Sequence, residues 1–379
     1  MQHLLAHLAE TFNSDFNTNL AFPQRTDVIP LCVNTDALVP REKAPLRKKL
    51  GLPKDAIVLL YLGYVSAMKA DLIPLLSILR NLVADNSKAS VLLVIAGTGR
   101  ELSFKALIDR SRALGVQKNV VIRRGITDEN KTLLLAAADI FVSPSDSIQE
   151  SFGLTPIEAM SCGVPQIVSD WDGYRDTVVD GETGFLVPTI WADCKAEYEG
   201  TGDVLGWEFD HISLGQSIAM DPGAMRDRLH ELIRNPELRA LMSRQSRMRA
   251  VEHFGYKAVA GQYDALFAEL MAIANTIPCP ATPRRFDQPA YFRIYGHYAT
   301  RGLGNEDHIA VAESTPRDAT PTIPMWSADL DDGLRVLDSA LAAALVETAR
   351  KHSSGQPPAL RVGHLIELAT RNGHHPIQC

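Results

Sequence analysis

The chain contains 379 residues, a length that predicts about two domains with a sizeable core. Its apolar content of 46% and charged content of 22% are those of an ordinary soluble globular protein. The formal net charge of −7 argues against broad nucleic-acid binding, although it is compatible with a local basic pocket for a phosphate.

The five cysteines and the N-terminal residues indicate the cellular compartment in which we expect the protein. The cysteines lack C-x-x-C spacing, so we expect neither a disulfide framework nor a zinc site, and a reduced compartment fits best. The first residues, M-Q-H-L-L-A-H-L-A-E-T-F, have no basic region and contain Glu10, so they are not a signal peptide. No apolar stretch approaches the roughly 20 residues needed to span a bilayer. We therefore expect a soluble cytoplasmic protein.

Between residues 57 and 188, short apolar runs alternate with helical patterns. Helices are expected near 71–84, 100–114 and 128–138. Strands are expected at 57–63, 91–97, 119–123, 140–143, 166–169 and 185–187. This alternation predicts a doubly wound α/β domain with a parallel, Rossmann-like sheet covered on both faces. Ligands bind beyond the carboxyl ends of such strands, which places a site at loops 63–70, 97–100, 123–127 and 144–155.

The remainder of the chain is less regular. Residues 190–222 lose the alternation and are interpreted as an irregular insertion, and helices are expected near 224–234, 236–252 and 256–274. Proline-rich stretches then mark linkers, and further helices are expected at 328–352 and 360–371. We predict three parts: a remnant or linker helix at 1–27, a main domain at 28–275, and a linker with a small, mainly helical appendage at 276–379.

The most informative segment is E-S-F-G-L-T-P-I-E-A-M at residues 150–160. Glu150 and Glu158 flank a turn at Gly153 that leads into a short helix, and a helix N-terminus binds anions. Two acids beside an anion site suit a ligand that offers both phosphate and sugar hydroxyls. An alternative stays open, because Thr155 and Glu158 fit a capping box with Pro156 at the first helical position. Glu158 would then only cap its own helix.

Two basic positions lie on the same predicted edge of the sheet. Lys69 precedes the helix at 71–84, where the helix dipole disfavours a cation, and a bound diphosphate would remove that conflict. The alternative is a solvated surface lysine. Arg124 ends the third strand, where a nucleotide base could lie, or it is merely surface charge. The A-G-T-G-R run at 96–100 does not complete a dinucleotide fingerprint, because Leu102 stands where the third glycine belongs.

These residues together resemble a known family. The loop E-S-F-G-L-T-P-I-E resembles the E-x7-E motif of retaining GT-B glycosyltransferases, and the nearest group is glycosyltransferase family four, the "glycosyl transferases group 1" domain. Further similar motifs follow in the family's order. They are V-I-P-L-C-V-N-T-D at 28–36, L-G-Y-V-S-A-M-K at 62–69, E-A-M-S-C-G-V-P at 158–165, D-G-Y-R-D at 172–176 and G-E-T-G-F-L-V-P at 181–188.

The resemblance implies a nucleotide-sugar donor and assigns roles by position. The catalytic residues would be Glu150, which would contact the donor sugar, and Lys69, which would contact the diphosphate. Glu158 would contact the ribose hydroxyls, while Arg124 would border the base. The remaining donor-binding positions are Gly63, Tyr64, Ser151, Phe152, Gly153 and Leu154. The resemblance also implies that no metal is needed, because Lys69 and backbone dipoles would stabilise the leaving diphosphate.

The chain departs from the family pattern in two places. The family usually has arginine where this chain has Tyr64, and its acceptor-binding N-terminal domain normally precedes the segment at 28–36, which here follows only about 27 residues. We therefore expect a hexosyltransferase that acts with retention on a saccharide, a lipid or a protein. Either the chain is truncated, or another chain supplies the acceptor side. The alternative is a nucleotide-sugar-binding module without turnover. A sugar-nucleotide epimerase ranks behind both, because the E-S-F-G-L loop is more typical of transferases.

Overall fold

The computed structural model describes residues 2–19, 26–85, 90–148, 150–195, 198, 207–274, 295–310, 344, 347, 348, 351 and 359–371. Its centre is a six-stranded parallel sheet in the order β3-β2-β1-β4-β5-β6. The strands are β1 (Ile57–Leu62), β2 (Val91–Gly97), β3 (Val120–Arg124), β4 (Ile140–Ser143), β5 (Gln166–Ser169) and β6 (Gly184–Val187). Every predicted strand of the doubly wound sheet is confirmed, with ends that differ by at most one residue.

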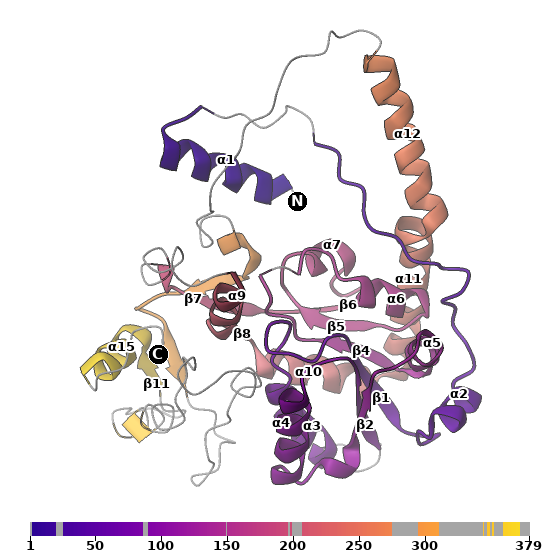
Figure 1. Ribbon diagram of the computed structural model, residues 1–379. Helices are drawn as coiled ribbons and strands as arrows, with labels where there is room; N and C mark the ends of the chain where they lie inside the picture. Colours follow the sequence, from indigo (N-terminus) through magenta and orange to yellow (C-terminus); the bar gives the residue numbers. More distant parts are fainter. Residues whose placement is uncertain are drawn as a thin grey trace.

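Helices cover both faces of the sheet, as the near-continuous apolar strands require (Figure 1). On β1, Leu59 and Tyr61 enter one core cluster, whereas Val58, Leu60 and Leu62 enter the other, because successive strand residues point to opposite faces. The first cluster includes side chains of α3 (Ile73–Asp85), α4 (Glu101–Ala113) and α10 (Pro222–Arg234). The second includes side chains of α2 (Lys43–Leu50), α5 (Asp128–Ala137), α6 (Leu154–Ser161) and α7 (Tyr174–Thr177).

A buried ion pair fixes α2 to the sheet. The Arg47 guanidinium donates to Asp139 Oδ2 over 2.5 Å and to the carbonyl oxygens of Lys54, Ala56 and Ala137. Burial alone would raise the pKa of Asp139, but Lys43, the Val58 N–H and Arg47 outweigh it and lower that pKa. The carboxylate is therefore held ionised beneath the helix.

The prediction of an irregular insertion at 190–222 is wrong. This region contains β7 (Thr189–Ala192), α9 (Trp207–Gln216) and β8 (Ile218–Met220). These strands form a second sheet in the order β8-β7-β9, in which β9 (Arg301–Leu303) comes from far downstream and pairs parallel to β7. The strands are only three or four residues long, too short to show alternation, and their partner strand is remote in sequence.

The described part of the appendage is not helical throughout. It holds a 3-10 turn, η2 (Gly296–Tyr298), strand β9, an antiparallel pair of β10 (His308–Ala310) with β11 (Ala359–Arg361), and α15 (Val362–Arg371). Helix α15 matches the predicted helix at 360–371, whereas most of the predicted helix at 328–352 lies outside the described residues. The proposed boundaries at residues 27 and 275 remain predictions.

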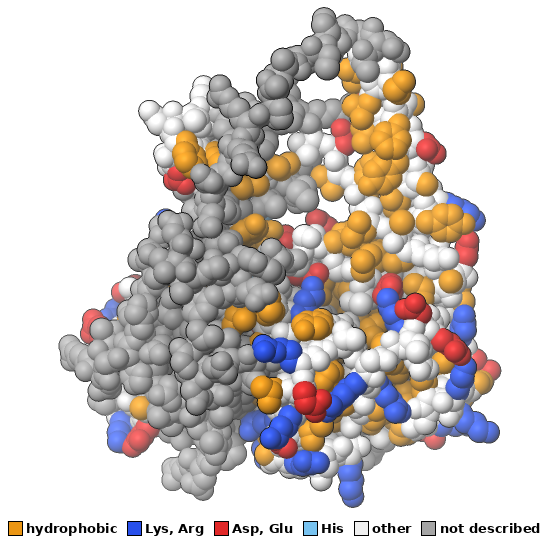
Figure 2. Space-filling model, viewed as in Figure 1, with side chains coloured by type: hydrophobic (Ala, Val, Ile, Leu, Met, Phe, Trp, Pro, Cys, Tyr) orange, Lys and Arg blue, Asp and Glu red, His pale blue; other side chains and the backbone are white. Residues whose placement is uncertain are grey.

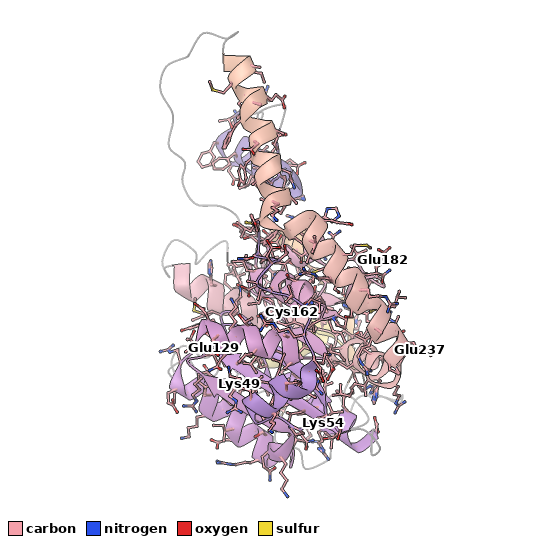
Figure 3. All side chains as sticks on the ribbon, turned by 90° about the vertical axis from the view of Figure 1, so that its right-hand side faces the viewer. Lys49, Lys54, Glu129, Cys162, Glu182 and Glu237 are labelled. Atoms are coloured by element: carbon pink, nitrogen blue, oxygen red, sulfur yellow. The ribbon has the colours of Figure 1, made fainter. Side chains whose placement is uncertain are left out.

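The remaining helices lie beside the main sheet or project from it. They are α1 (Gln2–Phe16), α11 (Pro236–Phe254), α12 (Tyr256–Ala274) and the short η1 (Gln117–Asn119). Helix α11 packs against α6 in a cluster with Ile157, Met160, Ala250 and Phe254, and α12 extends away from the sheet (Figures 1 and 3). Apolar side chains such as Phe267 and Met271 are exposed along α12 (Figure 2). None of the described helices has the length and apolar content required to cross a bilayer.

Candidate functional site

The carboxyl ends of β1 and β2 approach each other unusually closely. A Cβ added at Gly97 would lie 1.8 Å from Gly63 O, and one at Gly99 would lie 2.3 Å from Val65 O. Val65 and Gly99 continue the parallel pairing beyond the strands. The A-G-T-G run therefore serves backbone packing between two loops, which agrees with reading it as a glycine turn.

The two residues predicted to be catalytic lie in direct contact. Lys69 Nζ is 2.5 Å from Glu150 Oε2, and the side chains are 37% and 8% exposed, respectively. Ser145 Oγ donates to the Lys69 carbonyl oxygen over 3.0 Å, which ties the Lys69 segment to the loop that carries Glu150. Lys69 is thus not a freely solvated surface lysine, because a nearly buried carboxylate balances its charge next to the start of α3. Its partial exposure leaves the ammonium accessible to an anion.

Buried hydroxyl groups surround the Glu150 carboxylate on the side that faces the protein interior. Tyr174 OH donates to Glu150 Oε2 over 3.3 Å and shares a 2.7 Å hydrogen bond with Ser143 Oγ. Burial, followed by the charge of Glu150, raises the pKa of Tyr174 well above its ordinary value, so the phenol is neutral and available as a donor. Tyr61 is held neutral in the same way, and its hydroxyl donates to the Tyr64 carbonyl oxygen over 3.0 Å.

Asp146 is a further acid that sequence reasoning missed. Its Oδ2 accepts the Asp71 N–H over 3.3 Å, and its Oδ1 is buried with no hydrogen-bond partner among the described residues. Burial, followed by the nearby Asp71 charge, raises the pKa of Asp146 well above its ordinary value. Ser145 and Asp146 therefore anchor the segment that carries Lys69, through hydrogen bonds to the Lys69 carbonyl oxygen and the Asp71 N–H. The only sequence signal for Ser145 and Asp146 is their position in the loop between β4 and Glu150.

The predicted capping box is wrong. Helix α6 begins at Leu154, its N-cap is Gly153 with φ +90°, and no side chain of the described residues caps it. Thr155 and Pro156 are therefore inside the first turn rather than at the N-cap and first position. Gly153 is required twice, because of its positive φ and because a Cβ there would lie 2.5 Å from Tyr174 Cε1. The helix ends at Ser161, with Cys162 as its C-cap and Gly163 following at a positive φ of 70°.

Glu158 consequently does not cap its own helix. Its Oε1 accepts from Lys131 Nζ of α5 over 2.6 Å. Its Oε2 is buried and has no hydrogen-bond partner among the described residues. A buried carboxylate oxygen without a partner is costly unless a ligand supplies a donor.

The other predicted site residues lie in the loops after β1 and β4, at the end of β3 and at the start of α6. Arg124 Nη1 pairs with Glu101 Oε2 over 2.5 Å, and the guanidinium carbon lies 4.7 Å from the Phe104 ring centroid. Tyr64 and Leu154 are each 47% exposed, and Ser151 is also exposed. Phe152 instead packs edge-on against Phe254 with ring centroids 5.9 Å apart.

The comparison with protein families decides the assignment. Residues 42–196 match the family described as "Glycosyl transferases group 1". The chain contains a glycosyl transferases group 1 domain. The matched segment holds the Lys69–Glu150 pair, the α6 N-terminus and Glu158, and the match confirms the resemblance that the motifs indicated.

Similar curated proteins are D-inositol 3-phosphate glycosyltransferases. That of Streptosporangium roseum is 35% identical over 180 residues, covering 45% of this chain and 41% of the relative. That of Frankia alni is 28% identical over 259 residues, covering 67% of this chain and 54% of the relative. The chain thus spans about half or less of the length of these curated relatives.

Solved structures confirm the predicted GT-B-type, Rossmann-like fold. Sucrose-phosphate synthase from Thermosynechococcus elongatus aligns with a TM-score of 0.52 and 23% identity over 70% of this chain and 56% of that one. A glycosyltransferase from Rickettsia africae aligns with a TM-score of 0.53 and 16% identity over 70% and 62% of the two chains. An Anabaena protein in complex with UDP aligns with a TM-score of 0.51 and 18% identity over 64% and 57%.

Proposed function

We propose that this glycosyltransferase domain binds a nucleotide sugar and transfers its hexosyl group, with retention of anomeric configuration, to an acceptor hydroxyl. The observation that carries the proposal is the Lys69–Glu150 ion pair in the loops that follow β1 and β4, with the uncapped N-terminus of α6 a few residues beyond Glu150. Together these groups present a cation, backbone N–H groups and a carboxylate. A sugar diphosphate needs this combination, because it offers negative charge and hydroxyl donors on one molecule.

Each donor moiety has a candidate partner. The half-exposed Lys69 ammonium would face the diphosphate, together with the amides near Gly153 and Leu154. Glu150 would accept hydrogen bonds from sugar hydroxyls, and the unpartnered Oε2 of Glu158 would accept from the ribose. Arg124, at the end of β3, would border the base. Gly63, Tyr64, Ser151 and Phe152 would complete the donor site from its loops.

The proposed reaction balances without a metal ion. The bond between the anomeric carbon and the diphosphate oxygen breaks, and the acceptor oxygen bonds to that carbon on the same face. The acceptor proton passes to the departing diphosphate, which leaves with the bonding electron pair. Lys69 and the α6 amides would stabilise the charge that grows on the diphosphate, an effect expected to be worth about 10²–10³ in rate per well-placed donor.

The comparisons support this proposal from two sides. The similar curated proteins are named as glycosyltransferases, and one protein of the same fold is described in complex with UDP. Cys32, Cys162 and Cys194, the cysteines among the described residues, are free thiols, which favours the cytoplasm as the site of the reaction. The acceptor is a saccharide, a lipid or a protein.

A second candidate function is a nucleotide-sugar-binding module without turnover. It is favoured by Tyr64, which stands where the family usually has an arginine, so one cation that would stabilise the leaving diphosphate is missing. Incubation of the chain with UDP-glucose, GDP-mannose and ADP-glucose, with and without simple sugar acceptors, separates the candidates. Release of the nucleoside diphosphate supports the transferase, whereas binding without release supports the module.

Calorimetry on one variant pair tests the donor site itself. Glu158→Ala removes the orphan carboxylate oxygen, so we expect its affinity for the bound nucleotide sugar to fall at least tenfold. The matched control is Glu129→Ala, because Glu129 also pairs with a lysine over 2.6 Å but lies on the surface with Lys49 (Figure 3). Equal affinity of Glu158→Ala and the parent chain would remove Glu158 from the site.

A further inference from the structure

A structural unit outside the main sheet packs against the loops that carry the candidate site. We call it the bracing unit and define it as residues 189–192, 207–220 and 295–303. It comprises the sheet β8-β7-β9 with α9 and η2. Apart from β7, none of it lies within residues 42–196, the segment that matches the family.

An apolar cluster joins the bracing unit to the Glu150 loop. Ile148, two residues before Glu150, is buried with Trp171, Trp191 and Tyr298 in one cluster. Trp171 lies edge-on to the other two rings, with centroids 5.8 Å and 5.6 Å away. Its indole N–H donates to the Ser147 carbonyl oxygen over 2.7 Å. The Trp171 indole therefore holds the backbone just before Glu150, and side chains of the bracing unit pack against this indole.

Hydrogen bonds extend this contact along the loop at 170–175. Arg175 donates to Asp170 Oδ1 over 2.5 Å and to the His297 carbonyl oxygen over 2.7 Å. Thr300 Oγ1 donates to Asp170 Oδ2 over 2.7 Å. The Tyr298 hydroxyl lies beside the Asp172 carboxylate and partly offsets the rise in its pKa that burial causes, and Asp172 has a positive φ of 32°. Side chains and backbone of residues 297–300 therefore contact three positions of this loop.

The loop at 170–175 in turn holds Glu150. The Gly173 N–H donates to the Glu150 carbonyl oxygen over 3.1 Å. A Cβ at Gly173 would lie 2.2 Å from the Phe152 nitrogen, so the two backbones are in direct contact. Tyr174, the next residue, donates its hydroxyl to Glu150 Oε2. A displacement of this loop would therefore move both the backbone and the carboxylate of Glu150.

The bracing unit also reaches the Lys69 side of the pair. A Cβ at Gly215 of α9 would lie 3.7 Å from the Ala67 carbonyl oxygen and 4.0 Å from Asp146 Oδ1. These separations are ordinary van der Waals contact distances, so α9 lies close against the Lys69 segment and the acid that holds it. The unit thus contacts the supports of both members of the ion pair.

We propose that the bracing unit positions Glu150 against Lys69, and that Tyr298 and Thr300 are positioning residues of the donor site. The expected change in donor affinity rests on the proposed function. The expected loosening of the loop that carries Glu150 does not. The expected behaviour is that loss of a single hydroxyl group from residues 297–300 loosens residues 144–153 and weakens donor binding. Both effects should act through Glu150, because the loop at 170–175 contacts Glu150 directly.

Hydrogen exchange and calorimetry on the full chain test the proposal. The variants are Tyr298→Phe, which removes the hydroxyl beside Asp172, and Thr300→Val, which removes the donor to Asp170 and the acceptor of the Thr189 N–H. The matched control is Tyr263→Phe on α12, where the ring is 43% exposed and far along the sequence from the site. Exchange is followed in peptides covering 144–153, and affinity is measured for UDP-glucose, GDP-mannose and ADP-glucose.

We expect faster exchange over 144–153 in both variants and about a tenfold loss of donor affinity in Tyr298→Phe, with no change in the control. In a Glu150→Gln background, Tyr298→Phe should change affinity less than twofold, because coupled residues are not additive. A general loss of stability would instead lower affinity equally in both backgrounds.

Three contrary outcomes have distinct meanings. Unchanged exchange over 144–153 in both variants overturns the bracing role. Faster exchange with unchanged affinity, when Glu150→Gln itself lowers affinity, overturns the positioning of the donor site. Faster exchange in a chain that binds none of the three nucleotide sugars leaves the bracing contact standing and overturns the proposed function.

Discussion

Lys69 and Glu150 form a 2.5 Å ion pair in which the carboxylate is nearly buried and the ammonium is partly exposed. The asymmetry matters, because Tyr174 and Ser145 fix the buried partner, whereas the Lys69 side chain is 37% exposed. The pair joins the loop after β1 to the loop after β4. These strands are neighbours in the sheet although they are distant in sequence.

Replacing Lys69 with methionine should lower the affinity for the nucleotide sugar at least tenfold, because the variant keeps the bulk of the side chain but loses the charge that faces the diphosphate. Isothermal titration calorimetry measures the effect. Lys49→Met is the control, since Lys49 also forms a 2.6 Å pair but is 58% exposed on α2. Equal affinities for Lys69→Met and Lys49→Met would contradict the role of Lys69 in diphosphate binding.

Asp172→Asn should alter the pH dependence of stability. Burial raises the pKa of Asp172 to about 7 in spite of the nearby Tyr298 hydroxyl, whereas an unfolded aspartate titrates at 3.8. The folded chain therefore holds an extra proton between these values, and its stability falls as the pH rises through this window. Asparagine does not titrate and tolerates the positive φ.

Urea unfolding at pH 4.5, 6 and 8 measures this difference. We expect Asp172→Asn to be more stable than the parent chain at pH 8 by about 3 kcal/mol, with little difference at pH 4.5. The neighbouring groups Tyr298, Asp176 and Glu150 are unchanged in the variant, so the difference between the two curves reports Asp172. A constant difference at all three pH values would show that Asp172 does not titrate in this range.

The main sheet could be predicted from the sequence because its strands are continuous apolar runs, such as I-V-L-L-Y-L in β1, separated by helices with regular spacing. The Lys69–Glu150 proximity followed from the same topology, because carboxyl ends of parallel strands share one edge. Asp146 and Tyr174 could not be found in this way. Their importance comes from burial and from contacts with residues distant in the sequence.

Two errors have local physical causes. The capping box failed because Gly153, with a positive φ that suits glycine, takes the N-cap position ahead of Thr155. The strands at 189–192 and 218–220 were missed because a three- or four-residue strand carries almost no periodic signal. The partner of β7 at 301–303 follows a proline-rich stretch, which hid the relationship further.

Arg47→Met should destabilise the fold by about 3–5 kcal/mol, because it leaves the buried Asp139 carboxylate without its closest partner. Chemical denaturation at pH 7 measures the loss. Arg112→Met is the control, since its 3.4 Å pair with Asp109 is solvent-exposed and should contribute less than about 1 kcal/mol. The double variant Arg47→Met/Asp139→Asn should recover part of the loss, because it removes a carboxylate that in Arg47→Met keeps only the partly exposed Lys43 as a charged partner. If the double variant recovers no stability, the loss in Arg47→Met comes from packing rather than from charge.

Gly97→Ala should destabilise the chain by more than about 3 kcal/mol and weaken donor binding, because its Cβ would meet Gly63 O at 1.8 Å. Gly115→Ala is the matched control. Gly115 also has a positive φ, +71°, but nothing lies within 4 Å of an added Cβ, so only backbone strain of about 1–2 kcal/mol is expected. Thermal unfolding and calorimetry measure both effects. Similar losses of stability in the two variants would mean that the backbones at Gly63 and Gly97 can move apart at little cost.

The pairing of β7 with β9 has a consequence for dissecting the protein. A fragment that stopped at Ala274 would retain β7 but lack Arg301–Leu303, so one edge of a short sheet would lose its backbone partners. Trp171 and Trp191 would lose their contact with Tyr298 and become more accessible to water. Unpaired edges beside exposed aromatic rings promote association between molecules. Such a fragment should self-associate, and a useful expression boundary must lie beyond Leu303.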